Sequence, residues 1–314
     1  MNGIKVDQCW YIATGGSAVR VACAAAIAGV LGLGAIPCAA AGPDWSQVAA
    51  ALGKSGTEMP GGVYRIGLPR TDLHVTLDGV DLKPTFALGS WLAFRPDGGS
   101  TMVMGDLVLT EAEIAPVMTK LAEGGIEITA LHNHLLRAQP ATFYMHVWGH
   151  GDGVALATAL HDALVLSRTP LGAAGAGGSA APSIDLDTAM IDSTLGAKGH
   201  VAGGVYQVGI ARAGTIKDDG MDVPPAMGTA ESINFQPTGN GRAAITGDFV
   251  LTAAEVNPVL RTLRKNGIEV TALHNHMLGD QPHLFFMHFW ANDDARRLAT
   301  GLREALDKIN ITHS

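Results

Sequence analysis

The chain of 314 residues is long enough for two domains or for one large domain. Hydrophobic residues make up 47% of it and charged residues 16%, which favours a folded core and excludes intrinsic disorder. The formal net charge of −8, without any stripe of basic and aromatic residues, excludes general nucleic-acid binding.

Residues 1–41 have the pattern of a secretory signal peptide. Arg20 precedes an uncharged, apolar run over 21–36, and small residues follow up to a cleavage site after Ala41. An uncleaved membrane anchor is the alternative, but the run is short for a membrane span. We therefore expect an exported protein, secreted or periplasmic, without a stable membrane span after cleavage.

The leader also contains all three cysteines, Cys9, Cys23 and Cys38. Acylation of Cys38 would produce a lipoprotein, but Pro37 occupies a position where such signals prefer a small residue. Cleavage after Ala41 leaves a mature chain without cysteine, which excludes disulfides, thiol catalysis and cysteine-ligated zinc. Any metal would then need ligands from His, Asp or Glu.

The remainder of the chain contains two copies of one unit. Residues 61–70 match 203–212, and residues 105–148 match 247–290 with more than half of the aligned residues identical. We assign the first repeat to 42–170, a Gly/Ala/Ser linker to 171–183 and the second repeat to 184–314.

Each repeat predicts the order β-α-β-β-α after extra N-terminal strands. The elements expected in the first copy are strands at 63–68, 91–94 and 102–109, a helix after 110, strands over 126–135 and 142–149, and a helix over 153–166. Thr110 and Glu113 form a capping box, Gly125 ends the helix, and Pro116 predicts a kinked or delayed start. The last helix of the second copy is expected over 293–309. These patterns predict an α+β fold with largely antiparallel sheet and pseudo-twofold repeats, and leave open whether the repeats share one sheet.

Two histidines one residue apart recur in both copies as LHNH. His132 and His134 share one face of a strand, and a hairpin register centred near Gln139 would place His146 opposite His132. A His-x-His pair with a third His on the neighbouring strand is the layout of a three-histidine site for zinc or another divalent transition metal. The predicted metal ligands are His132, His134, His146, His274, His276 and His288.

Two other interpretations stay open. The histidines could be structural, with their hydrogen bonds satisfied inside the sheet, or they could line a pocket for a small molecule. The candidate ligand-binding residues are Arg70, Asp72, His74, Tyr144, Trp148, Arg212 and Trp290. A bound metal would support hydrolytic chemistry by activating water, whereas a non-catalytic binding module would use the pocket alone. The letters HNH by themselves carry no weight for the nuclease motif of that name.

Other polar residues recur in both copies and receive local explanations. Asp106 and Asp248 follow glycine, which favours a turn or bulge. Glu113 fits a helix cap, Arg70 and Arg212 favour surface ion pairs, and Glu127 faces away from the histidines by strand parity. The first copy is the better candidate for a working site, since it carries the additional residues Asp72, His74 and Trp91.

The segments GGVYR, LGSWLAF, GDLVLTEAEI, ALHNHLL and MHVWG together resemble the LppY/LpqO family of exported bacterial proteins. The resemblance covers nearly the whole mature chain. It implies a tandem domain of unknown function and export, in some members as a lipoprotein. It implies no activity and no catalytic residues.

Overall fold

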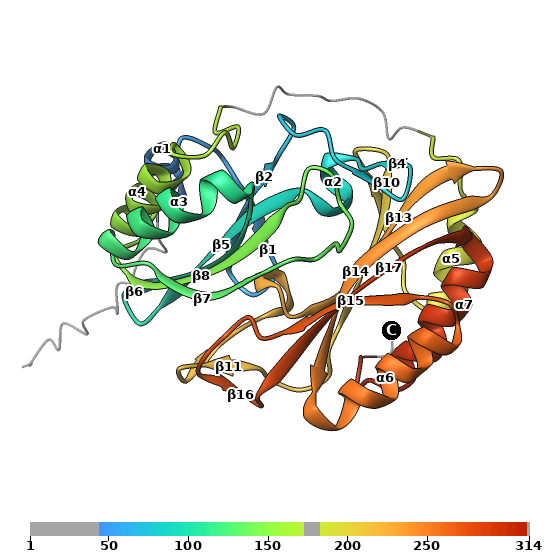
Figure 1. The fold of residues 1–314 in the computed structure, drawn as a ribbon. Helices are drawn as coiled ribbons and strands as arrows, with labels where there is room; N and C mark the ends of the chain where they lie inside the picture. The colour runs from blue at the N-terminus through green and yellow to red at the C-terminus, as the bar shows by residue number, and fades with distance from the viewer. Residues whose placement is uncertain (1–43, 173–182, 313–314) are drawn as a thin grey trace, which may run out of the picture. The chain divides into compact units, whose positions relative to one another are not determined.

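The computed structural model describes residues 44–172 and 183–312 (Figure 1). The predicted signal peptide, its three cysteines and most of the predicted linker lie outside these ranges. Both repeats belong to one unit, residues 42–314.

A six-stranded antiparallel sheet forms the centre of the first repeat, in the order β1-β2-β5-β6-β8-β7. Its strands are β1 (Thr57–Met59), β2 (Val63–Pro69), β5 (Gly89–Asp97), β6 (Ser100–Leu109), β7 (Glu127–His132) and β8 (Phe143–Gly151). The outer face of the sheet is covered by α1 (Trp45–Leu52), α3 (Glu111–Glu123) and α4 (Gly153–Leu164) (Figure 1). The connection from β2 to β5 contains β3 (Thr76–Leu77), β4 (Val80–Asp81) and the short helix α2 (Pro84–Ala87).

The second repeat has a sheet of the same strand order, β9-β10-β13-β14-β17-β15. Its strands are β9 (His200–Ala202), β10 (Val205–Ala211), β13 (Ala230–Gly239), β14 (Arg242–Thr252), β15 (Glu269–His274) and β17 (Leu284–Asp294). The covering helices are α5 (Thr188–Leu195), α6 (Ala253–Lys265) and α7 (Ala295–Leu306), and the smaller elements are β11 (Lys217–Asp218), β12 (Met221–Asp222), η1 (Pro225–Met227) and β16 (Asp280–Gln281). The predicted tandem α+β fold is thus confirmed, with one main sheet per repeat. Helices α1 and α5 were not predicted.

Helix α3 begins where its capping box predicts. The backbone N–H of Thr110 donates to Oε2 of Glu113 at 2.8 Å, and the helix starts at Glu111. Pro116 lies inside the helix, so the prediction that it delays the start is wrong. The capping box satisfies the first backbone donors, and this local effect fixes the helix start.

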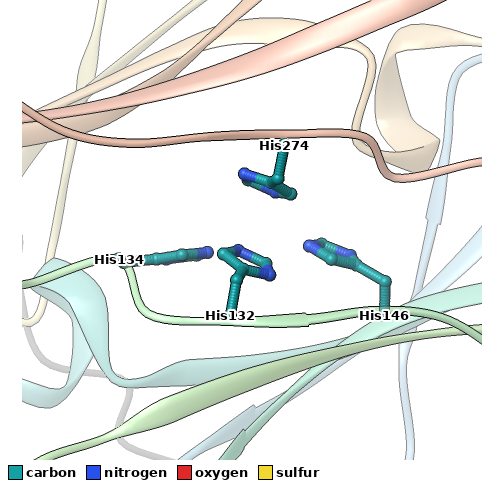
Figure 2. A group of neighbouring side chains, drawn as sticks. All are labelled: His132, His134, His146 and His274. Atoms are coloured by element: carbon teal, nitrogen blue, oxygen red, sulfur yellow. The ribbon is translucent and has the colours of Figure 1, made fainter.

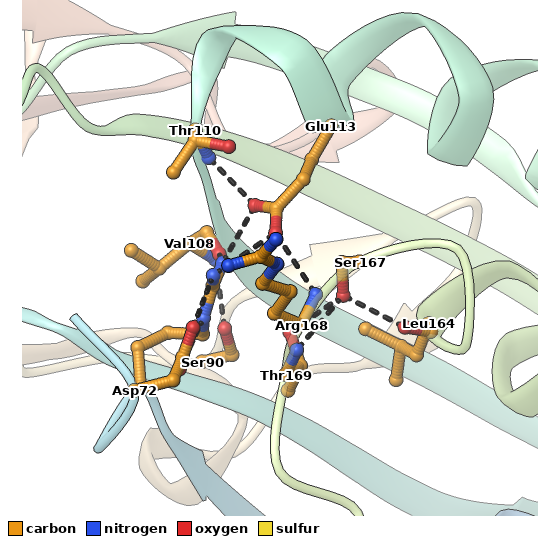
Figure 3. A network of polar contacts seen from close by, with 10 residues as sticks. Asp72, Ser90, Val108, Thr110, Glu113, Leu164, Ser167, Arg168 and Thr169 are labelled. Carbon is orange, nitrogen blue, oxygen red and sulfur yellow. Dashed lines mark hydrogen bonds and ion pairs between the residues drawn. The ribbon is translucent and has the colours of Figure 1, made fainter.

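The guanidinium group of Arg70 joins the start of α3 to the sheet. Arg70 is fully buried, so the expectation of a surface ion pair is wrong. It contacts Glu113 at 2.9 Å, Asp72 at 2.8 Å and the carbonyl oxygen of Val108 at 2.6 Å, within the network that Figure 3 shows. These contacts hold the pKa of Glu113 below its usual range although burial opposes them.

Arg212 makes the equivalent contacts in the second repeat, with Glu255 at 2.8 Å and the carbonyl oxygen of Val250 at 2.8 Å. It is 8% exposed and therefore also buried, which again corrects the surface ion pair expected from sequence. The guanidinium groups of both arginines therefore serve to hold the fold together.

Each repeat packs an apolar segment against the inner face of the other repeat's sheet. Leu82, Phe86 and their neighbours in the β2–β5 connection pack against Val205, Ala244 and Trp290 of the second sheet. The equivalent segment of the second repeat packs against Val63, Ala93 and Met102 of the first sheet. Each fully buried side chain of this size contributes roughly 1.5–3 kcal/mol, so the two repeats stabilise one another.

Candidate metal centre

Strand β7 ends at His132, so the strand predicted over 126–135 is too long and His134 lies in the connection to β8. The register of β7 with β8 also differs from the predicted one. Ala130 lies opposite His146, and His132 lies opposite Tyr144. The expectation that His132 faces His146 is therefore wrong, because the two strands are shifted by two residues relative to the predicted register. A bulge between Ile128 and Ala130 is also present, and β15 has the same irregularity between Val270 and Ala272.

The bulge changes the face on which the start of β7 lies. Glu127 pairs with Trp148, which shares a strand face with His146, so the prediction that Glu127 points away from the histidines is wrong. The extra residue, Thr129, donates its hydroxyl to the carbonyl oxygen of His276 at 2.5 Å. A local irregularity thus connects the two hairpins.

The two hairpins meet, and their histidines form one cluster instead of two separate patches. The ring centroids of His132 and His274 are 3.5 Å apart, and this pair lies between the others. Two further pairs cross the repeat boundary, His134 with His288 at 3.6 Å and His146 with His276 at 3.8 Å. Figure 2 shows His274 from the second repeat above the three histidines of the first. We call these six residues the histidine cluster.

Ring nitrogens in the histidine cluster are close enough to share ions. One group with ligand atoms all within 4.8 Å of one another consists of His132, His134, His146 and His274, and a second consists of His274, His276 and His288. Two ligands on one tetrahedral zinc, with bonds of about 2.0–2.1 Å, lie about 3.4 Å apart. Small side-chain movements would therefore bring these nitrogens to bonding distance.

The hydrogen bonds of the cluster leave at least one nitrogen of every ring without a partner among the described residues. Nδ1 of His288 contacts the carbonyl oxygen of Gly247 at 2.9 Å, and His146 bonds the backbone of Gly105. Within residues 44–172 and 183–312, the Nε2 atoms of all six histidines are buried and have no hydrogen-bond partner. Anchoring Nδ1 on a carbonyl fixes the ring and directs Nε2 inward, as is usual for histidines that bind metals.

Burial lowers the pKa of every histidine in the cluster. The pKa of His132 falls to about 4 and that of His288 to about 3, and repulsion between the rings adds to the effect at His288. The pKa values of His134, His146 and His276 lie well below the ordinary value for the same reasons. The rings are therefore neutral at neutral pH, which is the form that binds metals.

Asp106 and Asp248 border the histidine cluster, and the sequence interpretation did not assign them to it. They lie within the regular pairing of β6 with β8 and of β14 with β17, opposite His146 and His288, so the turn or bulge expected there is wrong. Asp248 oxygens lie 3.4 Å from Nε2 of His276 and 3.8 Å from Nε2 of His288. Recurrence of the GD pair in both copies was the signal that could have indicated them.

Both carboxyl groups hold their protons more tightly than usual. Burial raises the pKa of Asp106 to about 7, against the opposing charge of Arg65. Burial and the nearby Asp106 raise the pKa of Asp248 well above its ordinary value. Oδ1 of each aspartate is buried and lacks a hydrogen-bond partner in the described ranges.

Some of the remaining predicted site residues lie at the histidine cluster, and others lie elsewhere in the fold. Tyr144 stacks on His134 with ring centroids 3.4 Å apart and donates its hydroxyl to the carbonyl oxygen of Ala87 at 2.7 Å. Trp290 is buried in the core between the sheets and donates Nε1 to Asp78 at 3.0 Å, while Trp148 is packed in the corresponding core of the other repeat. His74 is exposed. Arg70, Asp72 and Arg212 belong to the ion pairs described above.

A cavity of about 530 Å³ adjoins the histidine cluster between the two sheets. Residues of the cluster and the two aspartates form one wall. The lining includes His134, His276, His288, Asp106, Asp248, Tyr144, Arg65, Gly67, Trp91, Gln207, Gly209, Ser232 and Asn234. Its volume falls in the range of small-molecule sites.

The chain is thus a tandem α+β protein whose two similar sheets face a shared histidine cluster. Residues 46–166 and 189–308 match the family described as Domain of Unknown Function (DUF1259), and the chain belongs to that family. No curated protein matches the chain at a significant level. Among the described residues, no helix is long and apolar enough to cross a membrane.

Two solved structures show a weak likeness to the chain. The trimeric bacterial microcompartment shell protein PduB is 11% identical, with 83% of this chain and 96% of that chain covered and a TM-score of 0.21. EtuB from Clostridium kluyveri is 8% identical, with 81% and 91% covered and a TM-score of 0.18. Likeness at this level carries no argument about fold, assembly or function.

Proposed function

We propose that the histidine cluster binds a divalent transition metal, with both repeats contributing ligands. The observation that carries the proposal is the buried, unpaired Nε2 atom on each of the six rings. A buried polar atom without a partner costs about 1–3 kcal/mol, and six such atoms gathered in one place need a common explanation. Metal ions bound by the two groups of ring nitrogens would satisfy these atoms.

The alternative of purely structural histidines requires satisfied hydrogen bonds inside the sheet. Backbone partners hold His146 and His288 through one nitrogen only. His132 and His274 have neither nitrogen paired in the described part of the chain. The donor set therefore fits a ligand better than it fits a packed core.

Asp106 and Asp248 are suited to complete the metal site from the side of the cavity. The separation of 3.4 Å between Asp248 and Nε2 of His276 is too long for a good hydrogen bond and close to the spacing of two ligands on one ion. His134 and Asp106 lie 3.8 Å apart in the equivalent place. Mixed imidazole and carboxylate ligands suit zinc and several other divalent metals. Such an ion supplies Lewis-acid chemistry, which extends the proposal to hydrolysis of a substrate in the cavity.

Metal content and thermal stability test the proposal. Chelated protein is reloaded with zinc, nickel, copper or manganese, washed, and analysed for bound metal and for its melting temperature. We expect at least one ion per chain and a rise in melting temperature, because a ligand that binds only the folded state stabilises it. His134→Ala and His276→Ala should each reduce bound metal, and His74→Ala is the matched exposed control. Less than about a tenth of an ion per chain with every metal, and no thermal shift, would contradict the proposal.

We also propose that the chain is exported and that residues 1–41 are its signal peptide. The apolar run at 21–36 and the resemblance to the LppY/LpqO family support this proposal. Expression in a bacterial host should yield a periplasmic or secreted product whose N-terminal residue is Gly42. Replacing Ala41 with a bulky residue should block cleavage and lead to accumulation of the precursor. A product that stays in the cytoplasm at full length would contradict the proposal.

A further inference from the structure

The cavity beside the histidine cluster is not symmetric, although the repeats that form it are related. Arg65 and Trp91 form its wall in the first repeat, and the residues at the matching positions of the second repeat are Gln207 and Ser232. Strands β2 and β10 supply Arg65 and Gln207, and β5 and β13 supply Trp91 and Ser232. One half of the cavity is therefore cationic and aromatic, and the other carries neutral amide and hydroxyl groups.

Arg65 is held in place by contacts that leave its charge unpaired. Its Cζ atom lies 4.0 Å from the centroid of the Trp91 ring, and its Nη1 atom donates to the carbonyl oxygen of Ala226 at 2.5 Å. No carboxylate of the described residues lies within ion-pair distance of it, although the charge of Asp106 acts on it. By contrast, Arg70 pairs with Asp72 and Glu113, and Arg212 pairs with Glu255. Burial lowers the pKa of Arg65 to about 10, so the group remains charged at neutral pH. A partly buried, unpaired guanidinium at a cavity wall is suited to bind an oxyanion.

The Trp91 ring is fixed by the opposite repeat. A Cβ atom at Gly228 would lie 2.8 Å from the ring, and Gly228 has a φ of +92°, so both the close approach and the backbone favour glycine there. The ring is thus held between Gly228 and Arg65. This packing limits the rotamers of both side chains, which reduces the entropy lost when a ligand binds.

Open space lies next to Arg65 on the same strand. Arg65 and Gly67 are two residues apart on β2 and therefore share a face, and a Cβ atom at Gly67 would meet no atom within 4 Å. Gly209 is in the matching position on β10 and is equally free of neighbours. The two glycines leave room in the cavity on either side of the pseudo-twofold axis.

We propose that this cavity binds a small organic anion whose carboxylate or phosphate group is held by Arg65. The remainder of the ligand then extends toward the wall formed by Asp106 and the histidine cluster. The inference rests on the proposed function in so far as a metal at the cluster would contact the same ligand. It names the substrate class of that site. It also explains why Arg65 is charged whereas Gln207, at the matching position of the second repeat, is neutral.

Titration calorimetry with benzoate and with inorganic phosphate tests the inference, and benzylamine serves as a probe of similar shape and opposite charge to benzoate. Each probe is titrated into the purified full chain, in one set after chelation and in another after metal loading. We expect benzoate, phosphate or both to bind and benzylamine not to bind. Arg65→Gln, which copies the second repeat, should weaken anion binding at least tenfold.

Matched glycine variants locate the ligand. Gly67→Leu should abolish anion binding by filling the space beside Arg65, whereas Gly209→Leu, on the other wall, should have a smaller effect. Melting curves establish that each variant is folded, and Gln207→Arg should preserve binding. Failure of both anions to bind, equal binding of benzylamine, or an unchanged affinity in Arg65→Gln would overturn the inference.

The two proposals can fail separately. Anion binding that depends on Arg65 in metal-free protein, together with no bound metal in any preparation, would support the anion site and contradict the metal site. Bound metal without any anion binding would support the metal site and contradict the anion site. The chelated and the loaded samples therefore distinguish the two.

Discussion

Gly105 lies in the middle of β6, where a side chain would collide with the neighbouring strand. A Cβ atom there would lie 2.6 Å from a methyl group of Leu92 and 2.7 Å from the carbonyl oxygen of Trp91. We therefore expect Gly105→Ala to lower the free energy of unfolding by about 1–3 kcal/mol. Gly67→Ala is the matched control, since its Cβ atom would meet open space and alanine restricts the unfolded chain. Urea unfolding measures both, and equal losses would contradict the packing described for β6.

The low pKa values of the histidine cluster should make the metal-free protein less stable in mild acid. Unfolded histidine titrates near 6.5, but the pKa of buried His288 is about 3, so the unfolded state takes up protons first as the pH falls. Stability is therefore lost progressively below pH 6.5, by an amount on the order of a few kcal/mol. Asp106 acts in the opposite direction, because its raised pKa of about 7 favours the folded state at low pH.

Melting temperatures of metal-free protein at pH 7.5, 6 and 5 show whether the histidines or the aspartates dominate the pH dependence of stability. Because the six histidines outnumber the two aspartates, we expect the melting temperature to fall toward pH 5. His288→Asn should make this fall with pH less steep. A melting temperature that rises toward pH 5 would mean that the carboxyl groups dominate.

At the scale of elements, the parts that sequence predicted correctly depend on neighbours close in the chain. The start of α3 follows from Thr110 and Glu113, three residues apart, and the strands around the histidines follow from local apolar patterns. The bulges at Thr129 and Thr271 reverse the strand face of the residues before them, and no local pattern marks them. The wrong face for Glu127 has this origin. The register of His132 opposite Tyr144 lies on the loop side of the bulge, so it depends on the connection between β7 and β8 and not on the bulge.

The ion pair between Arg70 and Glu113 fixes α3 on the sheet and should dominate the response of this helix to mutation. Glu113→Gln removes one of the two carboxylates that pair with a fully buried guanidinium, while Asp72 remains. We therefore expect a loss of about 1.5–3 kcal/mol. Because the folded pKa of Glu113 is depressed, the wild-type contribution is present above pH 4.5 and is lost as the pH falls below it. The variant should show a shallower loss over that range.

Glu111→Gln is the matched control for this prediction, since Glu111 is an exposed glutamate in the first turn of the same helix. Urea unfolding at pH 7 and at pH 4 gives both quantities. Similar losses in Glu111→Gln and Glu113→Gln would show that the buried pair does not stabilise the helix start.

At the scale of the whole molecule, the site depends on the association of the two repeats. A hairpin pattern could predict three histidines on one face, but six converge only because the inner faces of two sheets meet. The same association assigns Asp106 and Asp248 to the site. Contacts between residues about 142 positions apart leave no periodic signal in either copy alone, which is why sequence predicted two patches.

Gln236 provides a direct test of that association. It is 3% exposed, accepts from the backbone N–H of Lys83 at 2.9 Å and donates to the carbonyl oxygen of Asp81 at 2.7 Å, so it binds the first repeat from within the second. We expect Gln236→Ala to cost about 1–3 kcal/mol, since two backbone groups lose their partner. Gln47→Ala, at an exposed glutamine, is the control. Because the repeats share apolar cores, unfolding should remain a single transition in both variants. Two separate transitions, with neither displaced in Gln236→Ala, would show that the repeats fold independently and that the histidine cluster is not held by their association.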